Sequence, residues 1–252
     1  MAGRLHEKVA IVTGAGQGIG RGIALAIAKE GARVAAVGRT AAKVEKVAAE
    51  IAEAGGVAMP LAYDVSERSA VDDMVATVVD AWGTVDIVIN NAQDSVQRMF
   101  EETTDDDIAR AYRTGPLATV YVMQACLPYL KRRGGSVVNF GSSTAITGAA
   151  TFSSYAMAKE AIRGLTRVAS RELGRYGIRV NTVCPASLSP SAEDWATEHP
   201  ERFAKVLESI PLGRMGDAET DVGRAVVALV SDDLQYVTGS TLILEGGRVI
   251  LG

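Results

Sequence analysis

Short apolar runs alternate with longer stretches of helical spacing along this chain. Several of the apolar runs are continuous and rich in β-branched residues, which is typical of strands whose two faces are both covered. Strands that alternate with helices form βαβ units around a parallel sheet. The pattern therefore predicts an α/β fold, a doubly wound sheet of seven parallel strands with helices on both faces. The predicted strands are 8–12, 33–37, 57–61, 85–90, 136–140, 179–183 and 241–244, and the predicted helices are 20–30, 41–54, 68–81, 116–133, 153–176 and 218–230.

Glycine and proline fit the ends of these elements. Gly31 and Gly55 follow two predicted helices, where a left-handed cap needs no side chain. Pro116 suits the first position of a helix. The 252 residues contain no repeat, low-complexity run or linker, so we predict that residues 1–252 form a single domain.

The least regular region runs from residue 185 to residue 211 and carries Pro185, Pro190 and Pro200 among small polar residues. It follows the strand that ends near Cys184. Ligands of such sheets bind beyond the carboxyl ends of the strands, so a substrate lid over about 186–210 is the expectation. A surface excursion without a role is the alternative.

A glycine-rich turn, T-G-A-G-Q-G-I-G at residues 13–20, stands between the first strand and the first helix. Gly14 allows a tight turn, Gly18 lets the backbone approach a pyrophosphate, and Gly20 permits close packing of the helix on the strand. The start of the helix offers unpaired N–H groups and the positive end of its dipole to an anion. The turn predicts dinucleotide binding, with a merely tight structural turn as the alternative.

The end of the second strand bears on the choice between NADP and NAD. An acid that binds the ribose 2′-hydroxyl is usual there in NAD sites, but this chain has Gly38 followed by Arg39. A guanidinium binds a 2′-phosphate with charge-assisted hydrogen bonds. The sequence therefore favours NADP(H), with NAD(H) still possible. Arg39 as a solvated side chain is the alternative, and Gln17 puts no basic residue in the turn.

Tyr155 and Lys159 lie four residues apart in Y-A-M-A-K, near the start of a long predicted helix. At this spacing both side chains lie on one face of the helix. A lysine charge ~4 Å from a phenol is worth about 4 kcal/mol and favours the phenolate. We therefore expect the tyrosine pKa to move toward 7, where general acids and bases work best. Ser142 follows the fifth strand and can place its hydroxyl in the same crevice.

Composition excludes several other classes of function. The net charge of −4 includes no basic stripe of the kind that binds nucleic acid. No apolar stretch reaches the roughly 20 residues of a membrane span, and the N-terminus lacks the apolar run of a secretion signal. Cys126 and Cys184 predict buried thiols in a reducing cytoplasm. His6 and His199 have no neighbours at metal-ligand spacing, so no metal site is predicted.

Motifs along nearly the whole chain resemble those of the short-chain dehydrogenase/reductase family, in its single-domain branch of ~250 residues. Such a resemblance implies a Rossmann-like fold. The motifs are T-G-A-G-Q-G-I-G at 13–20, D-V at Asp64 and Val65, N-N-A at 90–92, Ser142, Y-A-M-A-K at 155–159, R-V-N-T-V-C-P at 179–185, P-L-G-R-M-G from Pro211, and T-G-S-T-L-I-L-E-G-G from Thr238.

The resemblance implies an oxidoreductase that moves a hydride between NAD(P)(H) and a ketone or secondary alcohol. In this reading Tyr155 is the general acid or base, Lys159 holds the nicotinamide ribose and lowers the tyrosine pKa, and Ser142 orients the substrate. It also implies a homotetramer packed through the helices that begin at Pro116 and Ser153. The implied cofactor-binding residues are Gly14, Gln17, Gly18, Ile19, Gly20, Arg39, Thr40, Asp64, Val65, Asn90, Ala92, Tyr155, Lys159 and Leu188.

Four positions depart from the family pattern. Gln93 replaces the glycine of N-N-A-G, and Gly115 stands in the place of an asparagine that supports a proton relay. Ala186 replaces the glycine of Pro-Gly, and Pro190 stands where a threonine usually contacts the nicotinamide. A catalytically idle dinucleotide-binding or regulatory protein of the same fold is therefore one alternative. Lyase chemistry is another, although Lys159 and the glycine turn argue against it.

Overall fold

The computed structural model describes residues 3–188 and 196–250 of the chain. Its centre is a sheet of seven parallel strands in the order β3-β2-β1-β4-β5-β6-β7. This confirms the predicted Rossmann-like sheet, and each of the seven predicted strands is present. The strands are β1 (Val9–Thr13), β2 (Arg33–Gly38), β3 (Val57–Ala62), β4 (Ile87–Asn90), β5 (Gly135–Phe140), β6 (Ile178–Pro185) and β7 (Thr241–Leu244).

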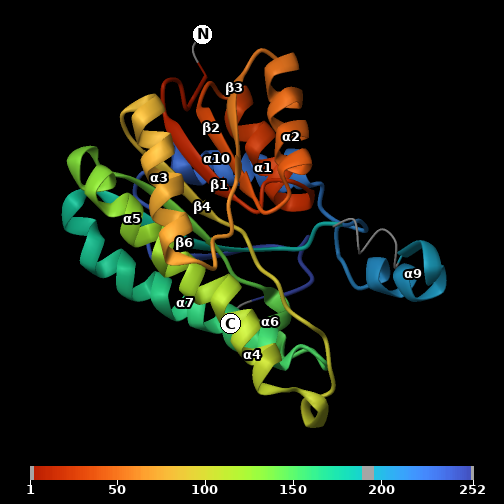
Figure 1. The fold of residues 1–252 in the computed structure, drawn as a ribbon. Helices are drawn as coiled ribbons and strands as arrows, with labels where there is room; N and C mark the ends of the chain where they lie inside the picture. The colour runs from red at the N-terminus through yellow and green to blue at the C-terminus, as the bar shows by residue number, and fades with distance from the viewer. Residues whose placement is uncertain (1–2, 189–195, 251–252) are drawn as a thin grey trace.

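Helices cover both faces of the sheet (Figure 1). Alternate residues of β1 point to opposite faces, so Ala10 and Val12 enter one apolar core while Val9 and Ile11 enter the other. One core takes side chains from α1, α2 and α10, and the second takes them from α3, α5 and α7. The helices are α1 (Gly18–Lys29), α2 (Ala41–Glu53), α3 (Arg68–Trp82), α4 (Asp105–Tyr112), α5 (Ala118–Arg133), α6 (Ser143–Thr147), α7 (Ser153–Leu173), α9 (Pro200–Glu208) and α10 (Arg224–Val230).

The predicted helix ends are close to the observed ones where glycine sets them. Gly31 and Gly55 both have positive φ, at 88° and 80°, as predicted for residues that follow a helix. The predicted helix over 153–176 continues past α7 as a 3₁₀ turn, Gly174–Tyr176. A π-helical turn, Ala218–Gly223, precedes α10 and completes the helix predicted over 218–230. Within the described residues, no helix combines the length and apolar character that a membrane crossing requires.

The predicted helix start at Pro116 is wrong. Thr104 caps α4 instead, because its hydroxyl accepts from the Asp107 N–H while the Asp107 side chain accepts from the Thr104 N–H. A π-helical turn, Arg113–Leu117, then joins α4 to α5 without a break. Proline lacks an N–H and crowds the preceding turn, and the wider π turn accommodates Pro116 inside the helix.

The predicted lid over 186–210 is described only in part, and Pro190 and Trp195 lie outside the described residues. Its first residues are fastened to the sheet. The Ala186 N–H donates to the Leu244 carbonyl oxygen at 2.9 Å, and the Gly216 N–H donates to the Ala186 carbonyl oxygen at 3.0 Å. The helix α9 forms the far part of this region (Figure 1).

Candidate active site

The carboxyl ends of β1, β2, β4 and β5 border a cavity of about 590 Å³. The Thr13 hydroxyl connects two of these ends. It donates to the Ile89 carbonyl oxygen at 3.2 Å and accepts from the N–H groups of Asn91 and Ala92, both at 3.1 Å. These bonds hold the residues after β4 against the turn after β1, so one rigid rim borders the cavity.

The glycine-rich turn forms one wall of the cavity. Gly14 and Gly18 have positive φ, at 67° and 54°, which side chains rarely tolerate. A Cβ at Gly20 would lie 2.1 Å from the Gly14 carbonyl oxygen, so only glycine lets the first turn of α1 pack so closely. The helix α1 begins at Gly18 and directs its unpaired N–H groups at the turn. The turn therefore fits a pyrophosphate.

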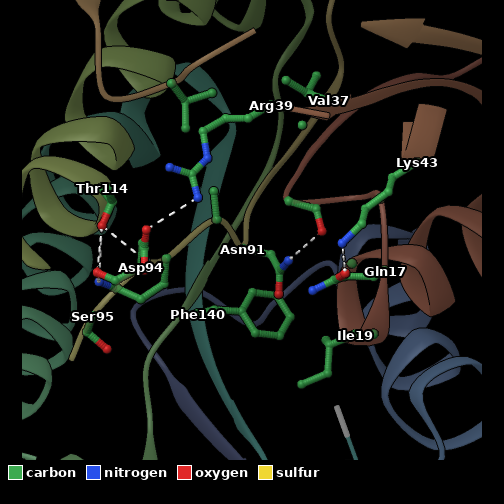
Figure 2. Close-up of a pocket in the computed structure, with 18 of the residues that line it drawn as sticks. Gln17, Ile19, Val37, Arg39, Lys43, Asn91, Asp94, Ser95, Thr114 and Phe140 are labelled. Atoms are coloured by element: carbon green, nitrogen blue, oxygen red, sulfur yellow. Dashed lines mark hydrogen bonds and ion pairs between the residues drawn. The ribbon is translucent and has the colours of Figure 1, made fainter. Parts of the chain in front are cut away.

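Two cations stand on the side of the cavity that the end of β2 and the start of α2 border (Figure 2). Arg39 is the residue after β2, and its guanidinium lies 3.3 Å from the Asp94 carboxylate. Lys43, in the first turn of α2, donates through Nζ to the Gln17 side-chain oxygen at 2.5 Å. Lys43 thus places a positive charge beside the glycine-rich turn, whose own sequence has Gln17 and no basic residue. The sequence signal that could have identified Lys43 is its place four residues after Arg39, across the start of the second predicted helix.

Tyr155, Lys159 and Ser142 line the opposite part of the cavity. The ammonium group of Lys159 is buried and donates to the Phe140 carbonyl oxygen at 2.8 Å. It lies 5.6 Å from the centre of the Tyr155 ring. The Ser142 hydroxyl is close enough to Tyr155 to act on the pKa of the phenol. The structure therefore brings together the three predicted catalytic residues, two from α7 and one from the end of β5.

The expectation that Lys159 brings the Tyr155 pKa toward 7 is wrong for the protein alone. Burial raises the pKa of Tyr155, and the neighbouring Ser142 hydroxyl opposes the rise only in part. Burial also lowers the pKa of Lys159 to about 8, since desolvation disfavours the charged form. The Lys159 ammonium donates a hydrogen bond to the Phe140 carbonyl oxygen and lies over the face of the phenol ring. Desolvation is the largest effect on the pKa of each group.

Most residues predicted to bind the cofactor line the cavity, but Asn90 and Leu188 are absent from its lining. The Asn90 side chain turns to the sheet and donates to the Asn139 side-chain oxygen at 2.9 Å. Asn91, the second asparagine of N-N-A, lines the cavity instead and donates to the Gly14 carbonyl oxygen at 3.3 Å. The predicted residues that do line the cavity are Gly14, Gln17, Gly18, Ile19, Gly20, Arg39, Thr40, Asp64, Val65, Ala92, Ser142, Tyr155 and Lys159.

The cavity has further lining residues that the sequence motifs do not mark. Gln93, Asp94, Ser95 and Thr114 approach it from the segment after β4 and from the π-helical turn. Figure 2 shows Asp94, Ser95 and Thr114 grouped on the side of the cavity opposite Gln17 and Lys43, with the Arg39 guanidinium directed at Asp94. Across residues 3–188 and 196–250, no group of three or more His, Cys, Asp or Glu side chains is placed to hold a metal ion.

The cysteines do not contribute a reactive thiol. Cys126 and Cys184 are both buried and unpaired, as predicted. Burial raises the pKa of the Cys126 thiol to about 12 and that of Cys184 to about 11. Both thiols therefore stay protonated at neutral pH, and neither of them lines the cavity.

Comparison with known sequences gives a consistent match. The profile of the family described as enoyl-(acyl carrier protein) reductase matches residues 14–248. The chain is 42% identical, over 97% of its length and 98% of the relative's, to a 12α-hydroxysteroid dehydrogenase of Clostridium sp. (strain ATCC 29733 / VPI C48-50). It is 32% identical, over 98% of its length and all of the relative's, to a 3-oxoacyl-[acyl-carrier-protein] reductase of Thermotoga maritima.

A solved structure agrees with the fold. A 7α-hydroxysteroid dehydrogenase complexed with NADH and 7-oxo glycochenodeoxycholic acid superposes with a TM-score of 0.92. The alignment covers 98% of this chain and 96% of that one, at 31% identity. Two of the three relatives described here are thus named as dehydrogenases of steroid alcohols.

The burial of Lys159 makes a direct prediction about its titration. In the cofactor-free protein with ¹⁵N-labelled lysine, we expect one ammonium resonance to titrate with a midpoint near 8, because desolvation disfavours the charged form. Lys159→Met must delete that resonance, which assigns it. A midpoint for the deleted resonance at the free-lysine value of about 10.4 would contradict the prediction.

Proposed function

The chain belongs to the short-chain dehydrogenase/reductase family, and we propose that Tyr155, Lys159 and Ser142 carry out its reaction with NADP(H) as the preferred cofactor. The protein is an oxidoreductase that transfers a hydride between a nicotinamide dinucleotide and a ketone or secondary alcohol. The observation that carries the proposal is that Tyr155, Lys159 and Ser142 line one cavity together with the glycine turn.

In this mechanism Tyr155 donates its hydroxyl proton to the substrate carbonyl oxygen during reduction. Ser142 holds the same oxygen by a hydrogen bond, and its own position is fixed because its Oγ accepts from the Thr144 N–H at 3.2 Å. When bound, the nicotinamide supplies or accepts the hydride. The raised pKa of Tyr155 keeps the phenol protonated at neutral pH, which is the form that carbonyl reduction requires. The phenolate that alcohol oxidation requires becomes more populated as the pH rises.

Lys159 has two tasks in this proposal. Its bond to the Phe140 carbonyl oxygen fixes Nζ at the carboxyl end of β5 and leaves further N–H groups for the nicotinamide ribose. Below its pKa of about 8 it also carries the positive charge that stabilises a phenolate on Tyr155. A lysine with a pKa of about 8 changes between its charged and neutral forms near neutral pH.

Replacing Tyr155 by phenylalanine tests the proton-transfer role. We expect Tyr155→Phe to lower kcat by about 10²–10⁴-fold and to leave the dissociation constant of NADPH within a few-fold of the parent, because the ring still fills its place. Tyr236→Phe is the matched control, since Tyr236 is fully exposed and outside this cavity. Substantial residual turnover in Tyr155→Phe would refute the assignment.

NADP preference is supported by the two cations near the turn. Arg39 pairs with Asp94 on the surface, where its side chain is 61% exposed, and exposed pairs are worth only about 0–1 kcal/mol. Asp94 has a second partner, Arg110, at 2.8 Å. The Arg39 guanidinium can therefore leave Asp94 for a 2′-phosphate while the carboxylate stays paired.

Removal of either cation should weaken the preference. We expect Arg39→Ala to raise the KM for NADPH about 10- to 100-fold, because a charge-assisted hydrogen bond is worth about 1.5–3 kcal/mol, with little effect on NADH. Lys43→Ala should act in the same direction. Lys46→Ala, an exposed lysine of the same helix outside the cavity, is the control. Equal or reversed preference in the parent enzyme would rule out the assignment.

For the substrate we propose a secondary alcohol or ketone on a bulky ring system, of which hydroxysteroids are an example. The names of two relatives support this class. So does the apolar segment that pairs with the chain beside Phe152. The Arg98 N–H donates to the Thr151 carbonyl oxygen at 3.0 Å, next to Phe152, whose ring contacts the Tyr155 ring. The following residues, Met99 and Phe100, are exposed apolar side chains.

A substrate panel distinguishes this class from a linear one. We expect a higher kcat/KM for 7-oxo and 12-oxo steroids than for a 3-oxoacyl thioester, because apolar contact area contributes about 25 cal/mol per Å² buried. Phe100→Ser should lower kcat/KM for the steroids through KM. A preference for the linear thioester would overturn the substrate class while leaving the reaction type intact.

Assembly and location complete the proposal. We propose a homotetramer packed through α5 and α7. Exposed apolar side chains on and before these helices, Leu117, Met157 and Val168, support it, since such side chains are enriched where subunits meet. We also propose a cytoplasmic location, which is supported by the two unpaired, buried cysteines, since disulfides are rare in a reducing cytoplasm.

A further inference from the structure

Gly115 and Gln93 fill one space between them. A Cβ built on Gly115 would lie 2.4 Å from the Gln93 side-chain oxygen and 3.1 Å from its Cδ. Real side chains do not approach this closely, so the Gln93 carboxamide occupies the room that a side chain at position 115 would need. Gly115 does not have positive φ. Its backbone conformation therefore does not require glycine, and the requirement comes from Gln93 alone.

The Gln93 carboxamide fastens the segment after β4 to the π-helical turn. Its Nε2 donates to the Ala111 carbonyl oxygen at 3.1 Å and lies 3.5 Å from the Thr114 hydroxyl. The Thr114 hydroxyl donates to the Asp94 carbonyl oxygen at 2.9 Å and accepts from the Asp94 N–H at 3.0 Å. Two adjacent residues thus hold the widened turn from the side of the sheet.

The π-helical turn supports the helix that carries the proposed catalytic residues. The π-helical turn Arg113–Leu117 packs against α7, the helix that carries Tyr155 and Lys159. Gln93 and Thr114 both line the cavity with these two residues. A displacement of the turn therefore displaces the support of α7, and misplacing a reacting group by about 1 Å can cost about 100-fold in rate.

We propose that Gln93 is a positioning residue, matched to Gly115, which clamps the carboxyl end of β4 to the π-helical turn and so sets the place of Tyr155 and Lys159. The inference rests on the proposed roles of those two residues. Gln93 Oε1 is buried and has no hydrogen-bond partner among the described residues, so hydrogen bonds hold the carboxamide only through Nε2, and Oε1 is the atom that a new side chain at Gly115 would meet first.

A double-mutant cycle tests the pair. Gly115→Asn should lower kcat about 10- to 100-fold, because its side chain displaces Gln93, and Gln93→Gly should lower kcat by removing the clamp. The double variant Gln93→Gly/Gly115→Asn should lose much less than the product of the two single effects, since the asparagine then has room and can restore the amide contacts. Losses that multiply would overturn the pairing, because independent sites are additive in free energy.

Further measurements separate positioning from folding. We expect the dissociation constant of NADPH and the Tm of Gln93→Met to stay near the parent values while kcat falls and its pH profile shifts, since methionine keeps the volume and loses the amide. Gly174→Ala, at an exposed glycine with nothing near its Cβ, is the control for Gly115→Asn. A fall in Tm with kcat and its pH profile unchanged would overturn the positioning role.

This outcome is distinct from a failure of the proposed catalytic roles. If Tyr155→Phe retains activity, the assignment of Tyr155 is wrong whatever the cycle gives. If Tyr155→Phe is inactive and the kcat losses of the two single variants multiply in the double variant, only the proposed pairing of Gln93 with Gly115 is wrong. Thermal unfolding and cofactor binding can be measured on all of these variants, whether or not they turn over substrate.

Discussion

The parallel register of the strands is the constraint on which this site depends. Because β1, β2, β4 and β5 pair in parallel, their carboxyl ends meet at one edge, and residues far apart in the chain border one cavity. Buried polar bonds then fix that edge. Thr13 joins the ends of β1 and β4, and Asn139 accepts from Asn90 while donating to the Thr166 hydroxyl on α7 at 3.0 Å. These groups are buried, so each broken bond would leave an unsatisfied polar atom at a cost of about 1–3 kcal/mol.

The sequence predicted what depends on local pattern. Continuous apolar runs located all seven strands, and the order of strand, glycine turn and helix located the cofactor wall, because both signals lie within a few neighbouring residues. The start of α4 is not predicted, although Thr104 and Asp107 form a capping box. Proline is typical of the first position of a helix, and Pro116 therefore indicates a later helix start. Asn90 and Asn91 could not be told apart, because the choice between sheet and cavity depends on which neighbour each side chain meets in space. Lys43 was missed for the same reason.

Electrostatics was the hardest part to predict, because the result is a difference between two large effects. A spacing of four residues brings Lys159 and Tyr155 onto one helix face, but it gives no information on how deeply either group is buried. Desolvation then raises the pKa of Tyr155 and lowers that of Lys159 to about 8. Burial thus favours the neutral form of both groups. A protonated phenol beside a weakly basic amine suits a site that gives a proton to a carbonyl oxygen at neutral pH.

The contacts of the residues that depart from the family pattern show more about the site than the number of departures does. Read singly, Gln93 and Gly115 each suggested damage to the site and gave support to a catalytically idle protein. In space they compensate, since the longer side chain at one position fills the room left by the missing side chain at the other. Ala186 likewise keeps its backbone bonds to Leu244 and Gly216. A motif records which residue types usually meet at a point, whereas function requires that the space be filled and the strand end be held, and two residues together can meet that requirement.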